Sequence, residues 1–154
     1  GAGVSAINAD ANGAVTMPLQ PAFLVQPASG QNNIAINTAV TVAFGTEIFD
    51  QNADFASNTF TAPVTGKYQF SVALYLQAID TGANYIDFQL RTSNRTYSVV
   101  IDPNFTADLN YFPFTFSILA DMDASDTTTF TITQGGGNAE LDITAGSFSG
   151  FLAC

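Results

Sequence analysis

The sequence predicts an all-β domain built as an antiparallel sandwich or barrel of short strands. Three observations carry this prediction. Apolar and polar residues alternate along several stretches, as they do on a half-buried strand. Clusters of Asp, Asn, Gly, Pro and Ser separate these stretches at short intervals. No stretch carries apolar residues at convincing helical spacing.

The expected strands follow one another along most of the chain. In the expected strand at 68–77, Tyr68 and Phe70 begin an apolar face, and polar residues such as Gln69 occupy the other face. Pro113 lies inside a stripe of phenylalanines, and because proline cannot donate to a ladder we expect a sheet edge or a bulge there. The alternating stretches are residues 40–44, 68–77, 86–91, 97–101, 112–118, 127–133 and 148–152. Turn residues mark 50–52, 80–82, 92–94, 102–104 and 135–137.

The composition excludes several classes of protein. The chain of 154 residues is 47% hydrophobic and only 10% charged, with a net charge of −10. It is long enough for one domain with its own core, and this composition is unlike that of disordered chains. Nucleic-acid binding is not expected with 3 basic residues, nor membrane insertion without a long apolar run. The outward strand positions are mostly small and uncharged, which suits burial against other copies of the chain.

Missing residue types argue against an enzyme. There is no His, so Ser-His-Asp and Cys-His catalysis lack their base, and one Cys cannot build a Cys-rich zinc site. The glycines at 135–137 lack the Lys of a phosphate loop and indicate a hairpin turn. A glycoside hydrolase using paired carboxylates is the catalytic alternative. Cys154 is either a small apolar terminal residue or half of an interchain disulfide.

The chain divides into two parts. Residues 1–20 are rich in Ala, Asn and Gly, and we expect a linker or the end of an upstream stalk. Residues 21–154 form the expected globular domain. Because the chain starts at Gly1 rather than at Met, we expect it to be a domain excised from a longer protein.

Three motifs resemble the globular heads of the complement C1q and tumour necrosis factor family. They are residues 21–23, the Phe-x-x-Pro-x-x-Gly-x-Tyr-x-Phe run at 60–70, and the Phe-Ser-Gly-Phe-Leu run at 148–152. We expect Gly66 to supply a backbone conformation closed to other residues, and Gly150 to allow close backbone approach. The signature residues are Phe23, Phe60, Pro63, Gly66, Tyr68, Phe70, Phe148 and Gly150. One departure is Ser125, which stands where the family usually carries Gly before Asp126.

The resemblance implies a ten-stranded antiparallel jelly roll that assembles into a homotrimer. Residues 8–18 also look like the run-in from a fibrous stalk that precedes heads of this kind on bacteriophage and microbial fibre proteins. We therefore expect a non-enzymatic trimeric head of a fibre-like protein, outside the cell or on a virion surface, that attaches to a cell-surface protein or glycan. The alternative is a purely structural trimerisation cap of a viral or microbial surface fibre.

Candidate ligand sites lie in the loops. Carboxylates at Asp121, Asp123 and Asp126 are candidate Ca²⁺ ligands, against the alternative of a solvated acidic turn. No other cofactor is expected, and the residues that would contact a receptor are not assigned. Two further acidic loops contain Asp102, Asn104 and Asp108, and Asp50, Asn52 and Asp54. The tyrosines that could stack on a sugar ring are Tyr75, Tyr85, Tyr97 and Tyr111, with core or interface packing as the alternative.

Overall fold

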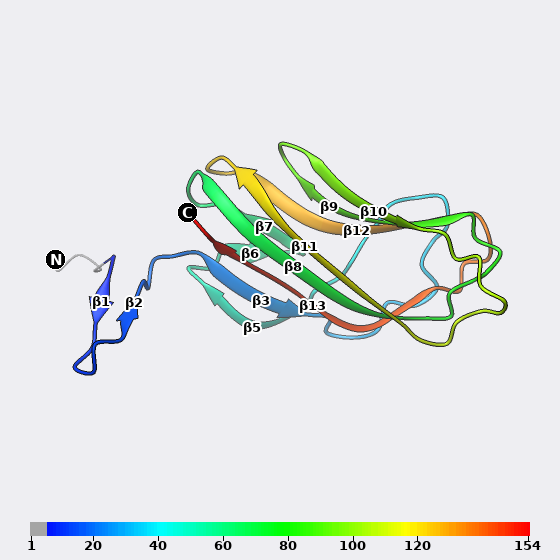
Figure 1. Cartoon of the computed structure of the whole chain (residues 1–154), viewed down its shortest axis with the longest axis horizontal. Coiled ribbons are helices and arrows are strands. Elements are labelled where there is room, and N and C mark those ends of the chain that lie inside the picture. Colours follow the sequence, from blue (N-terminus) through cyan, green and yellow to red (C-terminus); the bar gives the residue numbers. More distant parts are fainter. Residues whose placement is uncertain (1–5) are drawn as a thin grey trace.

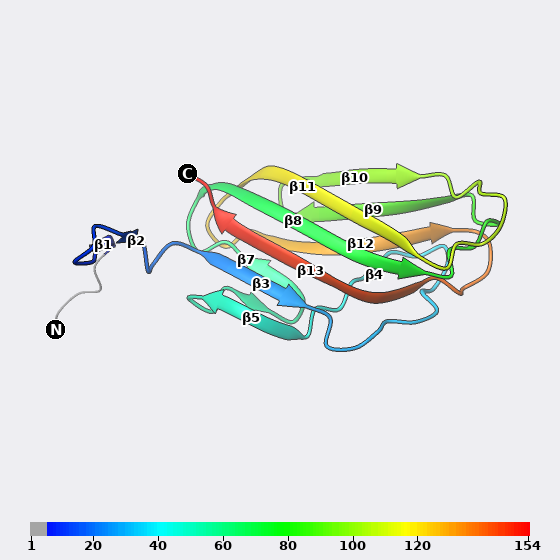
Figure 2. The same cartoon turned by 60° about the horizontal axis from the view of Figure 1, so that its bottom comes forward.

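The computed structural model describes residues 6–154, which contain thirteen strands and no helix. Two antiparallel sheets pack face to face, and a separate small hairpin projects from one end (Figures 1 and 2). One sheet has the order β11-β8-β13-β3-β5, made of Phe112–Met122, Gly66–Gln77, Asp142–Leu152, Ala22–Gln26 and Thr46–Gln51. The other has the order β10-β9-β12-β7-β6, made of Thr96–Ile101, Tyr85–Thr92, Thr127–Gly135, Thr59–Thr61 and Phe55–Ala56. β4 (Val40–Thr41) also pairs with β12, and β1 (Asn8–Ala9) with β2 (Val15–Thr16).

The predicted fold class is confirmed. Every pairing between the named strands is antiparallel, and the two sheets contain ten strands besides the two-residue β4. β11, which contains Pro113, is an edge strand of its sheet, as expected for a residue that cannot donate to a ladder.

The expected strand at 40–44 is shorter than its alternation predicts. Val42 and Phe44 are buried, but the ladder covers only Val40–Thr41. The N–H of Val42 still donates to the backbone carbonyl of Phe130 at 2.9 Å. The next two N–H groups donate to side-chain amides, Ala43 to Oε1 of Gln31 at 3.0 Å and Phe44 to Oδ1 of Asn58 at 2.7 Å. The apolar pattern therefore predicted the burial correctly, while the hydrogen-bond partners ended the strand.

The signature residues meet in the core. Phe23 lies between the two sheets, with ring centroids 4.9 Å from Phe60 and 5.0 Å from Phe148. Tyr68 and Phe70 complete this aromatic cluster, and both are fully buried. A Cβ on Gly150 would lie 2.6 Å from the ring of Phe70 and 2.7 Å from that of Phe23, so the glycine makes room for aromatic side chains rather than for the backbone that we expected.

Gly66 does not adopt the special backbone conformation that we expected from its place in the motif. Its backbone does not lie in the left-handed region; a side chain is excluded there by contact instead. A Cβ on Gly66 would lie 2.6 Å from Cδ1 of Leu152 and 2.7 Å from the carbonyl oxygen of Cys154. The C-terminal residues cross the start of β8 at this point, where Lys67 donates to the Cys154 carbonyl at 2.7 Å.

Ser125 keeps the left-handed turn that its position requires. Its φ is 76°, a region that favours glycine. A serine in this region is more strained than a glycine would be.

The molecule has two distinct ends. At the base end lie the β1–β2 hairpin and the C-terminus (Figures 1 and 2). At the distal end lie the loops β8–β9, β10–β11 and β12–β13 (Figures 1 and 2). Within residues 6–154 there is no helix with the length and apolarity needed to cross a membrane.

Candidate functional site

The outer face of the five-stranded sheet carries a patch of small uncharged side chains. The ladder register aligns Ser117, Ser71 and Ser149 in one row across three strands. It aligns Thr115, Ala73 and Ser147 in the next row. These six residues, named here the serine-rich face, surround a shallow hollow of about 270 Å³.

Hydroxyl groups on this face bond to one another. Ser71 and Ser117 lie 3.2 Å apart at their Oγ atoms, and Nε2 of Gln69 donates to the Ser117 hydroxyl at 2.8 Å. Because these polar groups already have partners within the sheet, covering the face with another surface leaves them satisfied.

Exposed apolar residues border the serine-rich face. Leu119 and Phe151 flank it toward the base end, Phe49 lies toward the β5 edge, and Tyr75 lies toward the distal end. Each of these side chains is about half exposed in the single chain. The charged residues of the five strands lie at strand ends or on the edge strand β5, at Lys67, Asp121, Asp142, Glu47 and Asp50.

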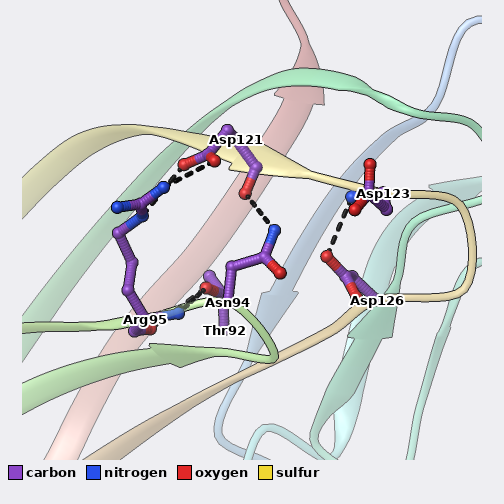
Figure 3. Close-up of polar contacts among 6 residues, drawn as sticks. All are labelled: Thr92, Asn94, Arg95, Asp121, Asp123 and Asp126. Atoms are coloured by element: carbon purple, nitrogen blue, oxygen red, sulfur yellow. Dashed lines mark hydrogen bonds and ion pairs between the residues drawn. The ribbon is translucent and has the colours of Figure 1, made fainter.

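The structure does not bring the carboxylates of Asp121, Asp123 and Asp126 together. Asp121 faces the guanidinium of Arg95, which donates from Nε at 3.0 Å and from Nη2 at 2.6 Å (Figure 3). Asp126 instead accepts the backbone N–H of Asp123 at 2.8 Å and closes the β11–β12 turn (Figure 3). The hydrogen bonds from Arg95 hold the pKa of Asp121 below its usual value. Ca²⁺ binding by these three residues stays a prediction.

A different acidic group forms at the distal end. Among residues 6–154, only Asp80, Asp108 and Glu140 place three carboxylate oxygens within 4.8 Å of one another. Asp108 accepts both the N–H and the hydroxyl of Thr81 at 2.9 Å, and the N–H bond is the main cause of its lowered pKa. Asp80 accepts the N–H groups of Gly82 and Asn138, so these carboxylates tie three loops together.

Sequence reasoning named Asp108 but missed this grouping. It placed Asp108 with Asp102 and Asn104, whereas Asp102 accepts the backbone N–H of Asn104 at 3.1 Å in a local turn. The three members of the distal group come from three loops far apart in the chain, so no local spacing could have indicated it.

The third acidic loop braces a turn at the base end. Asp50 accepts the N–H groups of Asp54 at 3.1 Å and Phe55 at 2.9 Å. Asp54 has one carboxylate oxygen that is buried without a partner. Burial, followed by the nearby charge of Asp50, raises the pKa of Asp54.

The four candidate tyrosines differ in exposure. Tyr97 is partly buried against the core, and Tyr85 lies against the backbone of Gly135. Tyr75 stands on the outer face of the five-stranded sheet, 59% exposed. Tyr111 is the most exposed, at 76%, and it borders a distal hollow of about 230 Å³ with Gln77, Asn110 and Asp142.

Comparisons with known proteins identify the fold. No protein-family model and no curated protein sequence matches the chain. The globular domain of zebrafish complement 1qA protein is similar in structure, with a TM-score of 0.64 and 19% identity over 88% of this chain and 98% of that one. The PRD1 vertex protein P5 is also similar, with a TM-score of 0.63 and 14% identity over 98% of this chain and 84% of that one.

A third similar structure comes from a tumour necrosis factor relative. Murine APRIL has a TM-score of 0.55 and 8% identity, covering 84% of this chain and 98% of its own. At these identities the likeness establishes the fold alone. The chain therefore has the jelly-roll fold found in C1q and tumour necrosis factor heads, as its motifs predicted.

Proposed function

We propose that this chain is a trimeric head domain of a fibre-like surface protein, assembled through the serine-rich face. The single observation that carries the proposal is this face itself. It is an uncharged hollow, in which Ser71 and Ser117 are hydrogen-bonded to each other, bordered by half-exposed apolar side chains, on a chain with a net charge of −10. Exposed apolar side chains on a surface whose centre carries no charge are features of a protein interface, because charged residues are depleted at interface centres.

The charge distribution supports self-association through this surface. Copies of a chain with a charge of −10 repel one another, so a contact between copies is least opposed where carboxylates are absent. The serine-rich face has no charged member, and the charged residues of its strands lie at their ends or on the β5 edge.

The mass of the assembly in solution tests this proposal. Light scattering should give three times the chain mass of 16.2 kDa, and the melting temperature should rise with protein concentration. Ala73→Arg places a charge at the centre of the face and should give a monomer. Val100→Arg, at an exposed position on the outer face of the other sheet, is the matched control and should remain trimeric.

Two results would contradict the proposal. A monomer mass for the unchanged chain over a wide concentration range is one of them. The other is equal assembly of Ala73→Arg and Val100→Arg, provided that both variants melt cooperatively.

We further propose that the distal end attaches to a cell-surface glycan or protein, from outside a cell or from a virion surface. The distal end lies opposite the N-terminal run-in, so an upstream stalk would present it outward (Figure 1). Tyr111 offers an apolar ring face beside the polar groups of Gln77, Asn110 and Asp142, a combination suited to a sugar ring. The likeness in fold to a phage vertex protein is consistent with a virion surface.

Binding of the trimer to glycans and to whole cells tests attachment. Tyr111→Ala should lower binding without changing the mass of the assembly, while Val64→Ala, at an exposed position in the loop before β8 at the base end, serves as the control. Equal binding by the two variants would contradict a role for the Tyr111 hollow. A chain that assembles and binds none of the offered surfaces would contradict attachment as a whole.

A structural cap is the second candidate function, and one observation favours it. The run-in is fastened to the head: Gln51 donates to the carbonyl of Met17 at 2.9 Å, Asn52 to that of Leu19 at 3.3 Å, and Gln20 to that of Leu152. A head fastened in this way would align the chains that enter it. Removal of the head from the full-length protein should then prevent trimerisation of the stalk, whereas an adhesive head would leave stalk trimers that no longer attach.

A further inference from the structure

The β1–β2 hairpin has one apolar face that no other residue in the range 6–154 covers. Ala9 pairs directly with Val15 and Asn8 with Thr16, so the first pair shares one face and the second pair the other. Ile7 and Met17 lie two residues from Ala9 and Val15 and therefore extend the apolar face. Ile7 is 63% exposed, Val15 64% and Met17 46%.

The hairpin is well defined although it lies outside the sandwich. The carboxylate of Asp10 accepts the N–H groups of Asn12 and Ala14, both at 2.8 Å. Gly13 adopts a φ of 83° in the turn. Because the Asp10 carboxylate accepts hydrogen bonds within its own turn, it gives no indication of a binding partner. The same bonds close the turn that joins the two strands, so the apolar face is present in the single chain.

The bonds that fasten the hairpin to the head leave this face open. They end on backbone carbonyls, those of Met17 and Leu19 on the hairpin side and that of Leu152 on the head side. A two-stranded hairpin is marginally stable on its own in water. An additional apolar surface packed on Val15 would stabilise it.

We infer that the apolar face of the hairpin packs against the same hairpin in other copies of this chain, forming a neck at the base of the trimer. This inference rests on the proposed trimer and adds a second contact to it. The hairpin leads through Pro21 directly into β3, whose outward residue Leu24 lies beside Ser149 of the serine-rich face. The hairpin is therefore continuous with the proposed interface.

The distribution of charge also favours another copy of this chain as the partner that covers the apolar face of the hairpin. No residue from 11 to 46 carries a charge, and Asp10 lies in the turn of the hairpin, so β2, the linker and β3 can approach their counterparts without repulsion between like charges of their own. Leu119 and Phe151 are exposed toward the same base end of the sheet and extend the apolar surface toward the hairpin. Assembly through the serine-rich face would bring these base ends together.

Thiol accessibility at two neighbouring positions tests the inference. In a Cys154→Ser background, Val15→Cys places a thiol on the apolar face and Thr16→Cys places one on the opposite face. In the assembled protein, Val15→Cys should react with a maleimide at least about tenfold more slowly than Thr16→Cys. Adding Ala73→Arg, which should separate the copies, should abolish this difference.

The possible outcomes distinguish a failure of the proposed neck from a failure of the proposed trimer. Equal reaction rates at the two positions in a chain of trimeric mass would overturn the neck and leave the trimer intact. Slow reaction of Val15→Cys that persists in the Ala73→Arg monomer would also overturn it, because the face would then be covered by its own chain. A monomer mass for the unchanged chain would refute the proposed trimer itself, and with it the neck.

Discussion

The hydroxyl of Tyr68 donates a 2.7 Å hydrogen bond to the backbone carbonyl of Val64, closing the loop that leads into β8. Its ring is fully buried against Phe60 and Phe70, so one side chain joins the loop to the aromatic core. The same residue belongs to the motif that identifies the fold from the sequence. The structure thus gives the tyrosine in that motif a physical reason beyond its apolar ring.

Tyr68→Phe should destabilise the domain by about 1 kcal/mol, since it removes one hydrogen bond and leaves the Val64 carbonyl without this partner. Chemical denaturation measures the change, with Tyr111→Phe as the control at an exposed ring. Equal stability of Tyr68→Phe and the unchanged chain would show that the hydroxyl contributes nothing to the loop.

Asp54→Asn should stabilise the folded chain at neutral pH. Burial and the charge of Asp50 raise the pKa of Asp54 in the folded state, so folding favours its protonated form. The contribution of Asp54 to stability is therefore fully present below its unfolded pKa and is lost as the pH rises through its folded pKa. Denaturation at several pH values should show that Asp54→Asn removes this loss. An unchanged pH profile would contradict the prediction.

Arg95→Gln should raise the pKa of Asp121 toward its ordinary value. The guanidinium lowers that pKa, so the pair stabilises the fold above the unfolded pKa of Asp121, and the effect is lost as the pH falls through the folded pKa. An NMR titration of the Asp121 carboxylate measures the shift, and Arg91→Gln is the control. The sign of this pH dependence is opposite to that of Asp54, so the two effects can be separated.

Ser125→Gly should stabilise the domain by about 1 kcal/mol. The serine holds a φ of 76° in the turn that Asp126 closes, and glycine adopts that region without a steric cost. The greater flexibility of glycine in the unfolded chain offsets part of the gain. Thermal and chemical denaturation measure the difference. A loss of stability would mean that Ser125 makes a favourable contact outweighing its strain.

Much of the fold could be predicted because its determinants are local. Alternation along a strand decides which side chains face the core, as it did for Tyr68, Phe70 and Phe88. The burial of Val42 and Phe44 was predicted in the same way, although the strand around them was not. Strand ends depend on hydrogen-bond partners such as Asn58, which a local pattern does not contain.

The candidate sites were predicted less well than the fold. The sequence grouped acidic residues that are neighbours in the chain, and the structure instead directs Asp121 to Arg95 and Asp126 to its own turn. The group of Asp80, Asp108 and Glu140 joins three loops that only the folding of the sandwich brings together. Similarly, the serine-rich face is assembled from three strands whose register no single stretch reveals.

By itself, the sequence determined the fold class, the aromatic core and the shortage of charge, because strand alternation and composition act over a few residues or over the whole chain. Only the tertiary structure decided which outward residues form one surface, which carboxylates meet, and that the apolar side of the hairpin at Val15 stays open. The physical reason is that burial follows from each strand's own pattern, whereas a surface or a site depends on the pairing of strands and loops distant in the chain.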